Sequence, residues 1–256
     1  MNNSPMFSVI TVCRNNYNGL VRTHESILSQ NYSKYEWIVI DGASTDGSKE
    51  YLEGLPKESC SWISEPDNGL YDAMNKGIDC ANGHYLLFLN SGDVLAAQDV
   101  LQMVASTITA NKYPGFIYGD AYEEIQNQVY VLKRAYTHRM LWYGMFTHHQ
   151  AMFFFMSSPK IKYSTDMRYA SDYGYVAQNL KSVSSVCRIT IPVCKFEAGG
   201  LSQSGSTVVA NREQWAVRHS VMGYSYFTCA AIDIMHVLIL MLKRRIPFVY
   251  KLIRFG

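Results

Sequence analysis

The chain has 256 residues, of which 48% are hydrophobic and 17% are charged, with a formal net charge of +2. This composition excludes a disordered chain, and the length allows one sizeable core with a small appended element but not three domains. The charge is too small for the basic surface of a typical nucleic-acid-binding protein, so we expect no nucleic acid among the partners.

The first residues read MNNSPMFSVITV and contain no basic leader followed by a long apolar run. We therefore expect no secretory signal peptide. The six cysteines show none of the two-residue spacings of zinc or redox motifs, and several lie in apolar runs. Free thiols in a reducing compartment are the expected consequence.

Short apolar runs alternate with helix-like segments over the first 120 residues. Strands are predicted at residues 7–12, 35–40, 60–64 and 84–89. The segment LYDAMNKGIDCA, residues 70–81, is predicted to be a helix because its apolar residues share one helical face. Near-continuous apolar strands separated by amphipathic helices indicate a parallel sheet that is covered on both faces.

Each of these strands is followed by a cluster of small and polar residues. In chain order the clusters read CRNN, DGASTDGS, EPDNG and NSGD. Sheets of this kind bind ligands beyond the carboxyl ends of their strands, which meet at one edge. Ordinary surface loops have no reason to be so consistently small and acidic, so we expect a ligand site along this edge.

From about residue 115 the pattern becomes less regular. Residues 115–121 and 128–133 are predicted to form a hairpin around EEIQN, and residues 151–155 a further strand. A helix that opens with an N-cap is predicted at residues 171–180, and a later strand at residues 186–196. Mixed strands after a parallel half indicate one α/β domain that is completed by a less regular second half.

Residues 206–256 are expected to form a C-terminal helical extension. Its last part is strongly apolar but is interrupted by Asp233, His236 and the run KRR, so no uninterrupted stretch approaches the roughly 18 residues that span a bilayer. Residues 224–256 can lie on an anionic membrane surface, or they can pack against the domain or a partner subunit. The sequence leaves both alternatives open.

Three carboxylates at the ends of predicted strands or turns are candidate site residues. Asp41 can accept a hydrogen bond from a uracil imide or a sugar, with a turn or helix-capping role as the alternative. Asp93 follows the small residues Ser91 and Gly92 and can bind Mg²⁺ or Mn²⁺ if a diphosphate and water complete the coordination, although NSGD is also a common turn. Asp120, which ends FIYGD, is either a ligand-contacting residue or a turn acid.

The segment FTHHQAMFF places two histidines directly before a predicted strand. Neighbouring side chains on an extended chain point to opposite sides, so His148 and His149 cannot easily bind one metal ion. One of the two can contact a ligand, and we select His149 with Gln150, with a packed histidine as the alternative. The Gly/Ser-rich segment 197–205 is expected to be a loop.

The order and spacing of SVITVCRN, WIVIDGASTDGS, EPDNGLYDAMNKGI and GHYLLFLNSGD resemble the family 2 inverting glycosyltransferases. Within that family the chain looks closest to bacterial enzymes of exopolysaccharide and colanic-acid-type gene clusters. The resemblance is strong over residues 7–95 and thinner over residues 115–205. It implies a Rossmann-like GT-A fold with a mixed central sheet over residues 1–205, with a nucleotide-binding half at about 1–115 and an acceptor half at about 116–205.

The resemblance also implies roles for single residues in donor binding and catalysis. Thr11, Asp41 and Asp67 match the positions at which the family grips the base and ribose of its nucleotide. Asp172, in YASDYG, matches the position of the catalytic base, with a helix N-cap as the alternative. In an enzyme that resembles this family, Asp120, His149 and Gln150 are expected to contact the acceptor or the diphosphate, and the loop at 197–205 can close over a bound donor.

NSGD stands where the family usually has an Asp-x-Asp motif that binds the ribose and a divalent cation, Mn²⁺ or Mg²⁺. The first and third positions of this motif are Asn90 and Gly92 in this chain, so the usual pair of carboxylates is missing. The resemblance then implies that Asn90 and Ser91 contact the nucleotide sugar and that Asp93 is the metal ligand.

The implied function is transfer of one sugar from a nucleotide-diphosphate sugar, with a UDP-sugar favoured, to a hydroxyl of a lipid-linked saccharide in bacterial surface polysaccharide synthesis. We expect a cytoplasmic enzyme, peripheral on the inner face of the plasma membrane, and the sequence also allows oligomers. Processive members of the family carry Gln-x-x-Arg-Trp and spanning helices, whereas this chain has REQWAVRH, so a non-processive enzyme is expected.

Two alternative hypotheses assign the chain to different functional classes. The altered Asp-x-Asp motif favours an inactive GT-A nucleotide-binding module that serves as a partner subunit. A dinucleotide-dependent oxidoreductase would need a Gly-x-Gly-x-x-Gly turn after the first strand, where CRNNYNG stands instead.

Overall fold

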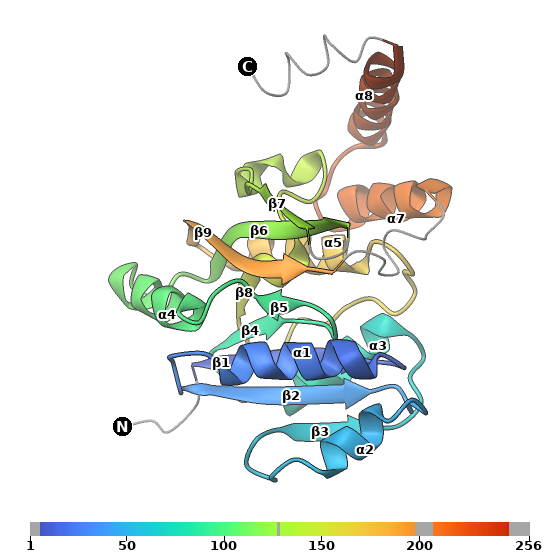
Figure 1. Cartoon of the computed structure of the whole chain (residues 1–256). Coiled ribbons are helices and arrows are strands. Elements are labelled where there is room, and N and C mark those ends of the chain that lie inside the picture. The colour runs from blue at the N-terminus through green and yellow to red at the C-terminus, as the bar shows by residue number, and fades with distance from the viewer. Residues whose placement is uncertain (1–5, 127–128, 198–206, 246–256) are drawn as a thin grey trace.

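The computed structural model describes residues 6–126, 129–197 and 207–245 (Figure 1). Its first part alternates strands and helices in the predicted order. The elements are β1 (Phe7–Cys13), α1 (Tyr17–Leu28), β2 (Tyr35–Asp41), α2 (Ser48–Glu53), β3 (Ser61–Ser64), α3 (Leu70–Cys80) and β4 (Tyr85–Phe88). The predicted strands of this part and the predicted helix at 70–81 are therefore confirmed to within one or two residues.

The second part is less regular, as predicted. Its elements are β5 (Val94–Leu95), α4 (Val100–Ala110), β6 (Phe116–Gln126), β7 (Val129–Lys133), the 3-10 helices η1 (His138–Trp142) and η2 (His149–Ala151), β8 (Met152–Phe155), α5 (Ser171–Ser182), β9 (Val186–Phe196), α7 (Thr207–Ser220) and α8 (Tyr226–Arg245). The predicted hairpin is confirmed, but its predicted turn is wrong. Residues 123–126 belong to β6 and pair with β7, because β6 continues further than its apolar run suggests.

Within the described residues, nine strands form one sheet in the order β3-β2-β1-β4-β8-β6-β9-β5, with β7 paired to β6. β1 pairs in parallel with β2 and β4, and β2 pairs in parallel with β3. β8 runs antiparallel to its neighbours β4 and β6. The predicted parallel half and mixed second half are thus joined in a single sheet.

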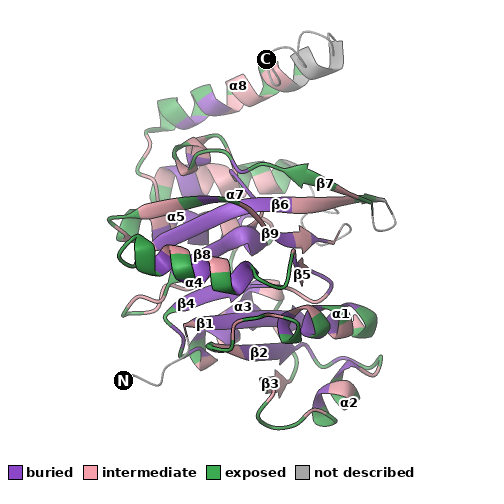
Figure 2. Ribbon diagram, turned by 60° about the vertical axis from the view of Figure 1, so that its left-hand side comes forward, coloured by how far each residue is buried: buried purple, intermediate pink, exposed green. Residues whose placement is uncertain are grey.

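Helices cover both faces of this sheet and give the fold three layers (Figures 1 and 2). Along β1, Ile10 and Val12 face a buried cluster with α3 and α5, whereas Phe7 and Val9 face a second cluster with α1 and α4. Successive side chains of a strand point to opposite faces, so burial on both faces requires an apolar residue at almost every position. This explains the uninterrupted apolar runs of the sequence.

The parallel register brings the predicted clusters to one edge of the sheet. Cys13 of β1 is level with Asp41 of β2, and Asp41 is level with Ser64 of β3. β4 enters the same register, with Phe88 beside Ile10. The clusters that follow these four strands therefore share an edge, which confirms the central prediction about the fold.

The two C-terminal helices α7 and α8 are joined to each other by an ion pair whose arginine is buried. Arg218 of α7 is almost fully buried and lies 2.7 Å from Asp233 of α8. α8 extends away from the sheet (Figure 1). Among the described helices, none combines the length and the apolar character that crossing a bilayer requires. All six cysteines are free thiols, as predicted.

The close approach of α3 to β1 generates a first prediction, on stability. A Cβ atom at Gly77 would stand 2.4 Å from Cγ2 of Ile10, so the Gly77→Ala variant must push two packed elements apart. Overpacking costs about 1–3 kcal/mol, which outweighs a helix-propensity gain of about 1 kcal/mol. We expect a lower urea midpoint for Gly77→Ala.

The matched control is Gly54→Ala, because the nearest atom to a Cβ at Gly54 is an ordinary 3.5 Å away. That variant should unfold at the wild-type midpoint or above it. An unchanged midpoint for Gly77→Ala would show that α3 is not packed against β1 as described.

Candidate functional site

A cavity of about 290 Å³ lies beside the edge at which β4 ends. Its wall combines side chains from α3, from the turn after β4, from η2 and from the start of α5. Predicted site residues in this wall are Asn90, His149, Gln150 and Asp172. The structure thus brings residues from both halves of the chain to one cavity.

Asp172 lines this cavity from the first turn of α5. α5 begins at Ser171 after an N-cap residue, Ala170, that makes no side-chain cap bond, so the alternative role of Asp172 as the N-cap is wrong. The carboxylate accepts a hydrogen bond from the backbone N–H of Tyr173 at 2.7 Å. Burial raises the pKa of Asp172 to about 6, and the charge of Glu213 adds to this increase. Such a carboxylate is ionised at neutral pH but remains basic enough to accept a proton.

Glu213 of α7 fixes the chain immediately before α5. Its carboxylate accepts hydrogen bonds at 2.8 Å from three consecutive backbone N–H groups, those of Arg168, Tyr169 and Ala170. Charge-assisted hydrogen bonds of this kind hold a loop firmly. Sequence reasoning missed Glu213, because its partners lie about 45 residues earlier and only the packing of α7 on α5 brings them together.

His149 and Gln150 are buried in the cavity wall. The Nε2 atom of His149 lies 2.6 Å from the hydroxyl of Tyr163, which stacks on Tyr175 at 4.0 Å between ring centroids. Burial lowers the pKa of His149 to about 3, so its ring is neutral at physiological pH. His148 stacks instead on Phe196 but lines the same cavity, and His149 begins the 3-10 helix η2, so the two histidines do not lie on opposite sides of an extended chain as predicted.

The ends of β2 and β3 bring together two carboxylates predicted to bind the nucleotide. Asp41 accepts hydrogen bonds from the N–H of Ser44 at 3.0 Å and from Oγ of Ser64 at 2.7 Å. Asp67 lies against Gly42, where a Cβ would be 3.0 Å from its Oδ2 atom, and it pairs with Lys76 at 2.7 Å. Asp67 is not the cap of α3, since Gly69 holds that position.

Thr11 has a different environment from the one that the family resemblance implies. It is fully buried, and its Oγ1 atom accepts a hydrogen bond from the indole N–H of Trp37 at 2.9 Å. The side chain therefore lies within the core between β1 and β2. The structure does not favour contact between Thr11 and a nucleotide.

Asp120 also makes structural contacts within the fold. It is buried, and its Oδ1 atom accepts a hydrogen bond from the N–H of Ala135 at 2.8 Å and lies 3.8 Å from the guanidinium of Arg188. These contacts fix the segment after β7. The structure does not bring Asp120 to the cavity, and so does not favour its predicted contact with the acceptor or the diphosphate.

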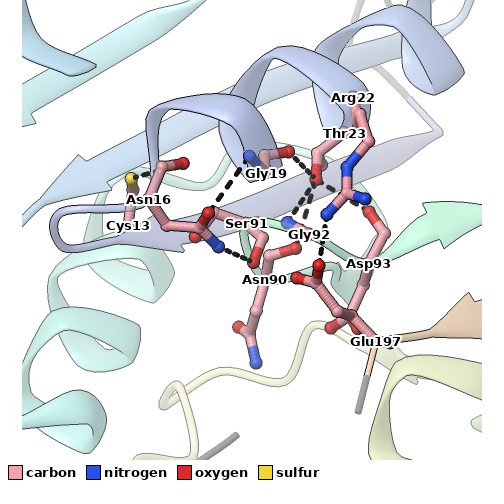
Figure 3. A network of polar contacts seen from close by, with 10 residues as sticks. All are labelled: Cys13, Asn16, Gly19, Arg22, Thr23, Asn90, Ser91, Gly92, Asp93 and Glu197. Atoms are coloured by element: carbon pink, nitrogen blue, oxygen red, sulfur yellow. Dashed lines mark hydrogen bonds and ion pairs between the residues drawn. The ribbon is translucent and has the colours of Figure 1, made fainter. Parts of the chain in front are cut away.

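The turn at residues 90–93 is held by α1 (Figure 3). The side-chain amide of Asn16 donates to the carbonyl of Ser91 at 3.0 Å. The hydroxyl of Thr23 accepts from the N–H of Gly92 at 3.0 Å and donates to the carbonyl of Asp93 at 2.8 Å. Sequence reasoning placed Asn16 in one of the four clusters but assigned no role to either α1 residue.

Asn90 differs from the rest of this turn because its side chain points away from α1 (Figure 3) and lines the cavity. Its Oδ1 atom is buried and has no hydrogen-bond partner within the described part of the chain. Buried polar atoms are almost always paired, so an unpaired amide oxygen in a cavity wall marks a place for a ligand.

Asp93 connects this turn to the end of β9. It is 3% exposed, and its Oδ1 atom accepts a hydrogen bond from the N–H of Glu197 at 3.0 Å. Burial raises the pKa of Asp93 to about 7, although hydrogen bonds from Glu197 and Gln150 oppose this increase. A carboxyl group that is enclosed in this way does not favour the predicted role of a direct metal ligand. The rest of the predicted loop, residues 198–205, lies outside the described residues.

The oxygen atoms at this turn suit a divalent cation only if a ligand supplies the other donors. Among the described residues, no three His, Cys, Asp or Glu side chains are grouped so that they could hold a metal ion. Mg²⁺ and Mn²⁺ accept one or two protein oxygens when phosphate and water complete the octahedron. The carboxylate of Glu197 beside Gly92 is an oxygen ligand of that type, while the unpaired Oδ1 of Asn90 lies on the other side of the turn, in the cavity wall.

A family model described as Glycosyl transferase family 2 matches residues 8–165. An uncharacterized glycosyltransferase of Mycobacterium tuberculosis is 43% identical over 110 residues, which cover 43% of this chain and 42% of the relative. A putative teichuronic acid biosynthesis glycosyltransferase, TuaG, of Bacillus subtilis is 35% identical over 92 residues, which cover 35% of this chain and 36% of the relative. The aligned segments thus span less than half of either relative.

Two solved structures share the architecture. S. aureus TarS 1–349 in complex with UDP-GlcNAc superposes with a TM-score of 0.69 at 14% identity, over 94% of this chain and 73% of that chain. The mannosyltransferase PcManGT from Pyrobaculum calidifontis in complex with GDP-Man and Mn²⁺ has a TM-score of 0.64 at 16% identity, over 87% of this chain and 65% of that chain. The predicted α/β fold with its mixed sheet is thereby confirmed as that of these transferases.

The enclosure of Asp93 predicts how stability depends on pH. The carboxyl ionises near pH 4 in the unfolded chain but only near pH 7 in the folded protein, so folding loses stability as pH rises through this window. The Asp93→Asn variant keeps the acceptor oxygen for Glu197 but cannot ionise. We expect it to be as stable as wild type at pH 4 and more stable at pH 8, by up to about 4 kcal/mol, as measured by urea unfolding.

The control is Asp99→Asn, which changes an exposed carboxylate that makes no cap bond. Its free energy of unfolding should differ little from that of wild type, and by the same amount at pH 4 and pH 8. If Asp93→Asn is less stable than wild type at pH 8, the ionised carboxylate is stabilising and the described enclosure is incorrect.

Proposed function

The chain belongs to glycosyl transferase family 2, and from this premise we propose that it is a non-processive, inverting glycosyltransferase. It moves one sugar from a nucleotide-diphosphate sugar, with a UDP-sugar favoured, to a hydroxyl of a lipid-linked saccharide in bacterial surface polysaccharide synthesis. One observation carries the proposal. A basic carboxylate, Asp172, and the side chain of Asn90, whose oxygen is unpaired, line one cavity beside the sheet edge that also carries Asp41 and Asp67.

In this proposal Asp172 activates the acceptor. The acceptor hydroxyl oxygen forms a bond to the anomeric carbon while the bond from that carbon to the diphosphate oxygen breaks, which inverts the configuration in one step. The hydroxyl proton passes to the carboxylate of Asp172, whose pKa of about 6 suits a general base at neutral pH. Glu213 acts through the backbone before α5 and keeps this carboxylate at the cavity.

The donor lies across the sheet edge. Asp41 and Asp67 orient the base and ribose, and the turn that contains Asn90 and Ser91 faces the diphosphate and the sugar. A divalent cation, when bound, offsets the negative charge that develops on the departing diphosphate. The Mn²⁺ in the PcManGT complex and the UDP-GlcNAc in the TarS complex support a donor of this chemistry.

The acceptor side of the cavity is formed by η2 and by the segment before α5. His149 is neutral and Gln150 is uncharged, so they offer hydrogen bonds without a fixed charge. This suits the hydroxyl groups of a saccharide. The teichuronic acid assignment of the Bacillus subtilis relative supports a surface polysaccharide as the destination of the sugar.

We also propose that α8 binds the cytoplasmic face of the membrane, which would bring the cavity to a lipid-linked acceptor. Phe227, Ile234, Leu238 and Met241 are all more than half exposed and share one side of the helix. The sequence of α8 ends in Lys243, Arg244 and Arg245. An apolar helical face beside basic residues is typical of helices that lie on anionic membranes.

Vesicle binding tests this membrane role. Each fully buried Leu or Phe side chain contributes about 1.5–3 kcal/mol, so the double variant Phe227→Ser with Leu238→Ser should bind phosphatidylglycerol vesicles at least about tenfold more weakly. Tyr113→Ser, which changes an exposed tyrosine on the loop after α4, is the control and should sediment with vesicles like wild type. If all three proteins bind vesicles equally, the proposal that α8 contacts the membrane is wrong.

The second candidate function is a nucleotide-binding partner subunit without activity. The observation that favours it is the loss of both Asp-x-Asp carboxylates, at Asn90 and Gly92, together with the enclosure of Asp93. Release of UDP from UDP-glucose, UDP-galactose or UDP-N-acetylglucosamine in the presence of Mn²⁺ distinguishes the two functions. An enzyme releases UDP slowly even without its acceptor, whereas an inactive module does not.

The base assignment makes a quantitative prediction. Loss of a general base costs about 10²–10⁴-fold in rate, so Asp172→Asn should reduce UDP release at least about 100-fold, while UDP affinity measured by calorimetry stays at the wild-type value. The wild-type rate should rise with pH, reach half of its maximum near pH 6 and level off above about pH 7, because only the ionised carboxylate accepts the proton.

Asp166→Asn is the matched control, since Asp166 is an exposed carboxylate six residues before Asp172. It should retain wild-type UDP release. Undiminished release by Asp172→Asn would exclude Asp172 as the base, and a parallel loss of UDP affinity would instead show that it shapes the donor site.

A further inference from the structure

The third position of the altered motif is a glycine whose missing side chain is replaced by a carboxylate from elsewhere. Gly92 has a φ angle of +105°, and a Cβ atom there would lie 1.7 Å from Oε2 of Glu197. Glu197 therefore occupies the volume that a side chain at position 92 would fill (Figure 3). Only glycine leaves room for this arrangement.

The backbone of Glu197 is held in this position by two independent contacts. β9 pairs with β5 directly after the turn, with Lys195 beside Val94. The N–H of Glu197 donates to Oδ1 of Asp93 at 3.0 Å. The enclosed Asp93 thus fixes the backbone of Glu197, while the side chain of Glu197 remains one-third exposed beside Gly92.

Among the described residues, the carboxylate of Glu197 has one positively charged partner. The guanidinium of Arg22, on α1, pairs with Glu197 and is itself 43% exposed. The carboxyl group of Asp93 is an acidic neighbour, and the charge of Glu197 contributes to the raised pKa of Asp93. The pairing with Arg22 is solvent-accessible and can be exchanged, because an exposed ion pair contributes only about 0–1 kcal/mol.

A second oxygen at the same turn lacks a partner. Oδ1 of Asn90 is buried in the cavity wall and accepts no hydrogen bond from any described residue. Carboxylate and amide oxygens are hard ligands of the type that Mg²⁺ and Mn²⁺ prefer. The turn therefore offers one carboxylate beside Gly92 although its motif has lost both aspartates, whereas the amide of Asn90 points away from α1 and lines the cavity (Figure 3).

We propose that Glu197 replaces the missing motif carboxylate and binds the divalent cation of the nucleotide diphosphate, exchanging its ion pair with Arg22 for the metal. This inference rests on the proposed function and assigns the cation ligand of that same site. Asp93 is then a positioning residue, which acts by holding the backbone of Glu197. Arg22 is a competitor of the cation for the same carboxylate.

If Arg22 and the cation compete for Glu197, variants at these two residues should change Mn²⁺ affinity differently. Free Mn²⁺ is titrated by its electron paramagnetic resonance signal at a fixed concentration of UDP, and in parallel GDP, with wild type, Glu197→Gln, Arg22→Ala and Glu53→Gln. Glu197→Gln should bind Mn²⁺ at least about tenfold more weakly, because changes even beyond the direct ligands cost about 10–100-fold in metal affinity. Arg22→Ala should bind Mn²⁺ as tightly as wild type or more tightly.

Glu53→Gln is the matched control, because Glu53 is also a partly exposed carboxylate in an ion pair, with Lys49 at 3.7 Å. It should leave Mn²⁺ affinity unchanged. The inference is overturned if Glu197→Gln binds Mn²⁺ like wild type, or if wild type with nucleotide binds none. It is also overturned if Glu197→Gln and Arg22→Ala weaken binding equally, since the ion pair would then be purely structural.

Failure of the inference is distinguishable from failure of the proposed function. Calorimetry with UDP and GDP in the absence of metal reports nucleotide binding independently of Glu197. If the protein binds nucleotide but Glu197→Gln binds Mn²⁺ as tightly as wild type, only the assignment of Glu197 as the cation ligand is refuted. Absence of any nucleotide binding would refute the proposed donor and, with it, the inference.

Discussion

The hydrogen bonds that clamp residues 90–93 between α1 and the end of β9 determine the geometry of the whole site. Thr23 and Asn16 hold the backbone of the turn from one side, and Asp93 holds the backbone of Glu197 on the other. The side chain of Asn90 leaves this fixed turn on the side away from α1 and lines the cavity (Figure 3). A parallel sheet supplies the frame, because it delivers this turn to the edge at which β1, β2 and β3 also end.

The cavity is completed by residues from the second half of the chain, which reach it by tertiary packing. Asp172 stands in the first turn of α5, and its position depends on Glu213, which binds the preceding backbone from α7. A stack of aromatic rings that includes Tyr163 and Tyr175 supports His149 beneath the cavity. Enclosure of this kind removes water from the carboxylate and raises its basicity, which is the property that a general base requires.

Much of the fold could be predicted from the sequence because its signals are local. Apolar runs, helical periodicity and strand-end clusters each depend on a few neighbouring residues, and parallel pairing then dictates a common edge. The environment of Thr11 could not be predicted, since β1 is buried on both faces and its sequence does not show which face meets a ligand. The partner of Asp93 lies 104 residues away, so its enclosure, like the contacts of Asp120, appears only in the folded chain.

The central claim is that this edge holds a nucleotide diphosphate together with a divalent cation. A crystal structure with UDP and Mn²⁺, with the metal located by its anomalous scattering, tests that claim most directly. The account predicts the uracil and ribose near Asp41 and Asp67, the diphosphate at residues 90–92, and the manganese between the diphosphate and the carboxylate of Glu197. A nucleotide bound away from this edge, or a manganese ion bound only to Asp93 or remote from the turn, would contradict it.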